Sequence, residues 1–261
     1  MNSLITLNPL DMALALALIG IAIALSRFSN LGLEGQFAIG SLRALLQLTI
    51  AGYILGFVFA LNNPFAVLLT LGVMLTVATL VTRNRIGKKL KRLLPIVWGS
   101  LLTSTTLTLS YIIVLIIQPE TWYDPQYLIP LAGMILGNAM DTATLAGERL
   151  VSTINSTALE IETHLSLGAT PQQAVAQPCR DAVRASLIPT LNRMSIVGLV
   201  SLPGMLTGQV LGGIDPLDAA LYQILIFFAI AFANLVAVLL VTRGVSQQFF
   251  NQNMQLLPLQ R

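Results

Sequence analysis

Long apolar runs recur along the whole chain, and they restrict its fold more than any other feature. Hydrophobic residues make up 55% of the 261 residues and charged residues 10%, whereas about 25% of residues are charged in a typical soluble domain. Runs of about 18 mainly apolar residues are long enough to cross a bilayer as a helix. Because they occur in series, a single cleavable leader does not explain them. The sequence therefore predicts an all-α, polytopic integral membrane bundle.

We expect about seven membrane-spanning helices. Their predicted ranges are Leu10–Leu25, Phe37–Leu61, Phe65–Val81, Leu94–Ile117, Leu128–Ala146, Leu187–Leu211 and Leu217–Val241. These spans leave almost no length for a separate soluble domain, so residues 1–261 are predicted to form one transmembrane domain. The predicted location is the cytoplasmic membrane, plasma or inner, as a multi-pass protein.

Basic and acidic residues fall on alternate connections between these spans. One set of connections carries Arg27, Arg83, Arg85, Lys88, Lys89, Lys91, Arg92, Arg149, Arg180, Arg184 and Arg243. The other set carries Glu120, Asp124, Asp215 and Asp218. Because cytoplasmic loops are enriched in Lys and Arg, this predicts the N-terminus outside and the C-terminus in the cytoplasm. Lipid headgroups then account for the net charge of +3, and no nucleic-acid partner is expected.

A polar stretch at about 148–186 separates the fifth and sixth predicted spans and would lie in the cytoplasm. Its helical periodicity is expected to end near Gly168, since glycine suits a helix C-terminal cap. Thr170, Pro171 and Gln173 have the types and spacing of a capping box that starts a new helix. Two short helices meeting at Gly168 would form a compact knob. The alternative is an amphipathic hairpin that lies on the membrane surface.

The pattern in this stretch resembles the loop by which permease subunits of ABC importers bind their ATP-binding partner. Glu162 precedes Gly168 by six positions, and Ala169-Thr170-Pro171 follows. Two departures are Thr163-His164 in place of Ala-Ala and Ile188-Pro189 further downstream than the short consensus. The resemblance implies docking residues Glu162, Leu167, Gly168, Ala169, Thr170, Pro171 and Ala174.

Three segments in the same order are similar to signature segments of the FetB-type permease family. They are Gly133–Met140, Leu165–Thr170 and Ser201–Gln209. That family is associated with iron export, and a plant relative with aluminium tolerance. The resemblance implies a permease that exports iron or another metal ion.

No phosphate-binding Gly-x4-Gly-Lys-Ser/Thr loop occurs in the chain. The resemblance therefore implies a separate ATP-binding subunit that carries ATP and Mg, with two copies of this chain forming the pathway. The chain itself is expected to bind no cofactor and to have no catalytic residue. Alternating access would couple ATP binding to reorientation of the bundle.

Polar residues inside predicted spans are candidates for the transport pathway, because such residues are costly in a bilayer. Asn138, Asp141 and Thr142 share one helix face by spacing, and their oxygens could coordinate a hard cation. They could equally form a structural pair with Asn192 or Arg193. Further candidates are Arg43 and Gln47, although Arg43 could simply extend to the interface.

Pro203 and Gly204 are predicted to kink or break the sixth span. Broken helices often line the substrate pathway of transporters, which adds Pro203, Gly204, Thr207 and Gln209 to the candidates. A packing kink without a substrate role is an equal alternative.

Methionines near the signature segments suggest a soft-metal site. Candidate metal ligands are Asp141, Met134, Met140 and Met205. Methionine is also a common gap-filler in apolar interiors, and the only histidine, His164, lies in the docking loop. The lone Cys179 cannot form a disulfide within the chain.

The function predicted from these observations is the permease subunit of a metal-exporting ABC transporter. One alternative keeps the ATPase partner but transports a lipid or a nucleotide sugar. Others are a stand-alone channel, an ion-coupled transporter, or a membrane scaffold whose loop binds another cytosolic protein.

Overall fold

The computed structural model describes residues 8–87, 90, 92–251 and 253–257, and these residues are almost entirely helical. The helices are α1 (Pro9–Phe28), α2 (Glu34–Leu61), α3 (Pro64–Ile86), α4 (Leu93–Tyr111), α5 (Pro125–Ser156), α6 (Ala158–Ser166), α7 (Pro171–Ala174), α8 (Ala176–Ile196), α9 (Gly204–Leu211) and α10 (Pro216–Gln247). A short π-helical segment, Ile112–Ile117, extends α4. Three basic residues of the predicted cytoplasmic cluster, Lys88, Lys89 and Lys91, lie outside the described residues.

Six helices in the described part of the chain are long and apolar enough to cross a membrane. They are Leu10–Phe28, Glu34–Leu61, Pro64–Ile86, Leu93–Ile117, Pro125–Ser156 and Pro216–Gln247. Each corresponds to one of the predicted spans, which confirms the all-α polytopic fold and the multi-pass membrane location. The remaining predicted span, Leu187–Leu211, is not one helix: α8 ends at Ile196 and α9 begins at Gly204.

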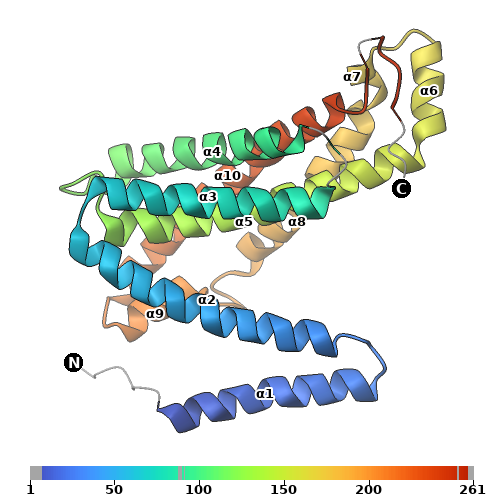
Figure 1. Cartoon of the computed structure of the whole chain (residues 1–261). Coiled ribbons are helices and arrows are strands. Elements are labelled where there is room, and N and C mark those ends of the chain that lie inside the picture. The colour runs from blue at the N-terminus through green and yellow to red at the C-terminus, as the bar shows by residue number, and fades with distance from the viewer. Residues whose placement is uncertain (1–7, 88–89, 91, 252, 258–261) are drawn as a thin grey trace. The chain divides into compact units, whose positions relative to one another are not determined.

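The chain divides into two compact units. The first comprises α1 and α2 with Leu211–Gly213, and the second comprises Asn63–Val210 and Ile214 onward. Within the second unit, α5 and α10 pack along each other, and α3, α4 and α8 pack against this pair (Figure 1).

Local sequence explains where the two central helices begin. Asp124 caps α5 by accepting a hydrogen bond from the Gln126 amide (2.9 Å), and Pro125 is the first helical residue. Asp215 and Pro216 start α10 in the same way. An N-cap carboxylate satisfies a free backbone N–H, and proline at the next position needs no hydrogen-bond acceptor. These Asp-Pro starts place the beginning of α5 ahead of the predicted Leu128.

Small residues allow close packing in the second unit. Ala139 and Ala143 of α5 and Ala237 of α10 are fully buried in one apolar core. Gly147 of α5 lies against Ile86 of α3, where a Cβ atom on the glycine would collide with the isoleucine side chain. Helices in lipid associate through such close van der Waals contact, since no hydrophobic effect drives them together.

Helices α5 and α10 both run toward the α6–α7 end of the unit, so the chain must return between them. Figure 1 shows that α8 and α9 make this return. The interrupted α8–α9 segment therefore takes the place of the predicted sixth span. The expectation that this span is broken is confirmed, and the non-helical stretch ends at the predicted Pro203-Gly204. The helix ends earlier than predicted, at Ile196.

Candidate functional site

A hairpin formed by α6 and α7 occupies the polar stretch that the sequence singled out. Gly168 adopts φ +92° just after α6. Its N–H donates to the Leu165 carbonyl (3.0 Å), and the Ala169 N–H donates to the His164 carbonyl (3.0 Å). This pair of bonds is the Schellman motif, which uses a left-handed residue to satisfy the last carbonyls of a helix. Glycine fits because it lacks the Cβ that makes this conformation unfavourable.

The second half of the hairpin begins with the predicted capping box. The Thr170 N–H donates to Gln173 Oε1 (2.9 Å), and the Gln173 N–H donates to Thr170 Oγ1 (3.3 Å). Pro171 is the first residue of α7. Hydrogen bonds between residues at most five positions apart therefore fix the backbone on both sides of Gly168.

The outer surface of the hairpin combines apolar and acidic side chains. Leu159 is 79% exposed and Leu167 is 81% exposed, and Glu162 is also exposed. In contrast, Ala174 and Ile161 are buried in the core, so they hold the hairpin in place rather than forming its surface. The two leucines are eight positions apart and are the large apolar side chains that the hairpin leaves exposed among the described residues.

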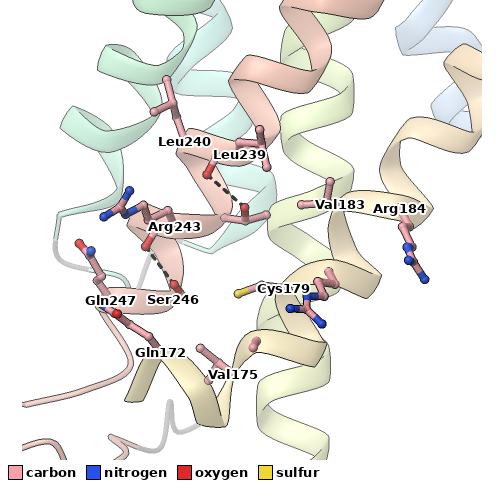
Figure 2. A pocket seen from close by; sticks show the side chains of 13 residues that line it. Gln172, Val175, Cys179, Val183, Arg184, Leu239, Leu240, Arg243, Ser246 and Gln247 are labelled. Carbon is pink, nitrogen blue, oxygen red and sulfur yellow. Dashed lines mark hydrogen bonds between the residues drawn. The ribbon is translucent and has the colours of Figure 1, made fainter. Parts of the chain in front are cut away.

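The hairpin rests on the C-terminal end of α10. Helix α7 contacts both α8 and α10. A groove of about 650 Å³ lies beside this contact, with Gln172 and Val175 near α7 and Leu239, Leu240 and Arg243 on α10 (Figure 2). Helix α7 is therefore packed against the end of α10.

The groove is basic. Its lining includes Arg180, Arg184 and Arg243, and no acidic residue lines it within the described ranges of the chain. Cys179 also lines it, and burial raises the pKa of this thiol, while a hydrogen bond with Ser246 partly offsets the effect. A neutral thiol adds no negative charge beside the arginines.

A second, smaller cavity of about 220 Å³ lies among α5, α8, α10 and the start of α9. It is lined by Met134, Asn138, Thr190, Arg193, Pro203, Gly204, Met205, Gln223, Ile226, Phe227 and Ile230. Asn138 is 13 residues after the start of α5, or about 20 Å along the helix at 1.5 Å per residue. The cavity therefore lies well inside the membrane-crossing part of α5.

The polar side chains of this cavity are linked in two pairs. Arg193 Nη1 donates to Asn138 Oδ1 (3.2 Å), and Asn138 Nδ2 donates to the Met134 carbonyl (2.8 Å). Asn234 Nδ2, which is fully buried behind the cavity, donates to Thr190 Oγ1 (2.9 Å). Asn138 is half-buried and Asn234 is fully buried, and hydrogen bonds of this kind offset the cost of placing an amide among apolar helices.

Gln223 differs from the other polar residues of the cavity. Its side chain is only 7% exposed, and its Oε1 has no hydrogen-bond partner within the described ranges. Buried polar atoms are nearly always paired in folded proteins, and an unpaired one needs an explanation such as a missing ligand.

The interruption between α8 and α9 ends beside this cavity, at Pro203. Gly198 has φ +79°, and its N–H donates to the Ser201 carbonyl (3.0 Å). Leu199 and Val200 are more than 80% exposed in this loop. Pro203 and Gly204 then start α9 and line the cavity, so the break places irregular backbone beside the polar side chains. Irregular backbone at membrane depth is tolerated where it is buried in protein or lines a cavity.

The cavity contains some of the residues predicted for the pathway and not others. It includes Asn138, Pro203 and Gly204 of the predicted pathway residues, and Met134 and Met205 of the predicted metal ligands. Asp141 is exposed on the outside of α5, and the Thr142 hydroxyl donates to the Asn138 carbonyl of its own helix (2.8 Å). Asn138 therefore lines the cavity and accepts a hydrogen bond from Arg193, whereas Asp141 is not among the lining residues that the structure describes.

The remaining predicted residues lie elsewhere. Thr207 is exposed and donates to the Pro203 carbonyl (3.1 Å), and Gln209 is half-buried with an unpaired Oε1 among the described residues. Arg43 and Gln47 are exposed on α2, in the other compact unit. Of the proposed metal ligands, Met134 and Met205 line the cavity, while Met140 packs against the apolar core. Within the described residues, no group of three or more His, Cys, Asp or Glu is placed to hold a metal.

Sequence reasoning missed Thr190, Gln223 and Asn234 as site residues. Gln223 and Asn234 are amides inside the most apolar helix of the chain, whose mean hydropathy reaches 3.0. Their polarity within such a span was a signal that could have identified them, since polar residues in the membrane are costly and face the bundle interior. Thr190 has no comparable signal, because threonine is common in membrane helices.

Comparison with known proteins relates nearly the whole chain to one family. Residues 9–250 match the model of an uncharacterised protein family, UPF0014. The chain is 56% identical over 256 residues to the UPF0014 membrane protein slr1647 of Synechocystis sp., covering 98% of this chain and 99% of that protein. No solved structure matches the chain.

More distant relatives carry functional names. The chain is 36% identical to the probable iron export permease protein FetB of Escherichia coli, over 94% of this chain and 93% of FetB. It is 35% identical to Protein ALUMINUM SENSITIVE 3 of Arabidopsis thaliana, over 94% of this chain and 88% of that protein. The matched segment contains the hairpin, both cavities and all six apolar helices, and the chain belongs to the UPF0014 family of membrane proteins.

Proposed function

We propose that this chain is the membrane-spanning permease of an ATP-driven transporter, and that a separate ATP-binding subunit docks on the α6–α7 hairpin. The observation that carries the proposal is Leu167, which is 81% exposed at the end of a turn fixed by the Schellman motif and the capping box. A rigid turn that presents an exposed leucine is suited to a pocket on another protein.

The hairpin is also placed so that it can move the helices around the cavity. Helix α7 contacts α10 near Ser246. Gln223, which also belongs to α10, lines the cavity. The two positions are 23 residues apart in one unbroken helix, or about 35 Å at 1.5 Å per residue. Closure of an ATPase pair below two copies of this chain would shift α7 and α10 and change access to the cavity.

The proposed orientation places the N-terminus outside and the hairpin in the cytoplasm, where an ATP-binding subunit and its ATP and Mg would be found. The basic groove beside the hairpin supports this orientation, because basic residues are enriched on the cytoplasmic side. The cargo we propose is iron or another metal ion, on the basis of the FetB relative's name.

The first test is purification of the tagged chain from its own membrane in mild detergent. We expect a polypeptide with a Gly-x4-Gly-Lys-Ser/Thr loop to co-purify at near-equal amounts and to hydrolyse ATP. Candidate metals and metal chelates would then be tested for stimulation of that hydrolysis. A chain that purifies alone and catalyses flux without an ATPase would instead indicate a channel or an ion-coupled transporter.

A further inference from the structure

The cavity at the α8–α9 break contains a cation and no acid. Its lining includes Arg193 and, among the residues that the structure describes, no Asp, Glu, His or Cys. The carboxylate predicted to face this region, Asp141, is exposed on the outside of α5 instead. Arg193 is itself exposed beside the cavity. A bare metal cation there would meet this guanidinium with no carboxylate in the described lining to balance either charge, and like charges repel.

The hydrogen bonds of Arg193 hold its position without neutralising its charge. Its partner, Asn138 Oδ1, is a neutral amide oxygen at 3.2 Å. The Asn138 amide is fixed in turn by the Met134 carbonyl, at 2.8 Å from Nδ2. A guanidinium has five N–H donors, so others remain for a ligand. Arginine in this setting is suited to a planar carboxylate or to a phosphate group.

Two further groups complete a polar lining. The Thr190 hydroxyl accepts from Asn234 Nδ2 (2.9 Å), and an accepting hydroxyl keeps its own proton to donate. The Gln223 amide is 7% exposed, with Oε1 unpaired in the described part of the chain. Its oxygen can accept from a ligand hydroxyl and its nitrogen can donate to a ligand oxygen.

We propose that this cavity binds an oxyanion group, carboxylate or phosphate, through Arg193, with Thr190 and Gln223 as neutral partners. At about 220 Å³ the cavity is smaller than the ~300 Å³ at the low end of whole-ligand sites, so it would hold one end of a larger molecule. If the chain is a transporter as proposed above, its cargo enters as an anion. A metal ion would then cross in a carboxylate chelate and not as the free cation.

The test is ligand binding by the intact chain in lipid nanodiscs, without an ATPase. The probes are radiolabelled citrate, ferric citrate, inorganic phosphate and ferrous ion kept reduced with ascorbate. We expect the wild-type chain to bind at least one anionic probe. Arg193→Gln should weaken that binding about tenfold or more, and Arg193→Lys should restore most of it, because lysine keeps the charge.

The probes distinguish the possible sources of the oxyanion. Binding of citrate and ferric citrate would identify a carboxylate chelate, whereas binding of phosphate alone would identify a phosphate ester. Arg149→Gln, which removes an exposed arginine of α5 outside the cavity, should leave binding unchanged. Thermal unfolding of each variant separates lost binding from lost folding.

Two results would overturn the inference: ferrous ion that binds equally to the wild type and to Arg193→Gln, or a folded wild type that binds none of the anionic probes. Neither outcome depends on a partner subunit. Anion binding that requires Arg193, in a chain that purifies without an ATPase, would support the site and contradict the proposed ATP-driven function.

Discussion

Arg193 of α8 donates a hydrogen bond of 3.2 Å to the side-chain oxygen of Asn138 in α5, across 55 residues of sequence. This bond joins the two helices on either side of the hairpin at the cavity. It also leaves the arginine charged, since the amide that accepts the bond is neutral.

Replacing Asn138 with aspartate tests the importance of that neutrality. Asn138→Asp would place a carboxylate beside the guanidinium and form an ion pair that competes with an anionic ligand. We expect citrate or phosphate binding to weaken about tenfold or more while the fold is retained. Equilibrium binding in nanodiscs measures the effect. Unchanged anion affinity would show that Arg193 does not contact the ligand.

Leu167→Asp tests the hairpin surface. The side chain is 81% exposed, so the substitution should leave the thermal unfolding temperature within error. In a protein interface, loss of a buried leucine and introduction of a charge should weaken binding of the ATP-binding subunit by about 2 kcal/mol or more. Co-purification and ATP-dependent transport measure the effect. Normal recovery of the partner would place the docking surface elsewhere.

Gly147→Ala tests the close approach of α5 to α3. The new Cβ atom would collide with Ile86, and overpacking of this kind costs about 1–3 kcal/mol of stability. In an Ile86→Ala background, which is itself destabilised by the lost core side chain, the further change Gly147→Ala should cost less than it does in the wild type, because the colliding side chain is gone. Gly137→Ala is the matched control, because no atom lies within 4 Å of its added Cβ. Thermal unfolding in detergent would show equal stability of both glycine variants if the packing is looser than described.

Asn234→Leu separates a functional amide from a structural one. Asn234 is fully buried and its Oδ1 is unpaired in the described structure, while its Nδ2 holds the Thr190 hydroxyl. Leucine of similar volume removes the cost of an unsatisfied polar atom, so stability should be unchanged or higher. Ligand binding should fall because the Thr190 hydroxyl loses its fixed orientation. A large loss of stability with normal binding would assign Asn234 a structural role.

The hairpin could be predicted residue by residue because its signals are local. The left-handed Gly168 and the Thr170–Gln173 capping box depend on bonds between residues at most five positions apart. The helices that cross the membrane were predictable for a similar reason, since length and apolarity determine them. The ends of the six helices differ from the predicted ones: Asp-Pro pairs start α5 and α10 before their apolar runs, and both helices continue past the predicted C-terminal ends, to Ser156 and Gln247.

The cavity could not be predicted in the same way, because it depends on which faces of distant helices meet. Spacing placed Asn138 and Asp141 on one face, but the packing of α8 against α5 directs Asn138 inward and leaves Asp141 exposed. Pro203-Gly204 correctly predicted a broken helix, yet the break begins earlier, at Val197, beside a glycine (Gly198) that the sequence analysis did not use. Gly198 has a positive φ in the folded chain, and a glycine in the sequence does not by itself show which φ the backbone adopts.

The fixed turn at Gly168 has a consequence for the kinetics of assembly. Ordering a flexible loop costs about 1–2 kcal/mol per residue, and a docking segment that folded on contact would lose that free energy from its affinity. In the α6–α7 hairpin the backbone around Gly168 is already held by its own hydrogen bonds before any partner arrives. Association should therefore proceed without a folding step, with a rate that is limited by encounter and orientation and a heat-capacity change that reflects only the surface buried.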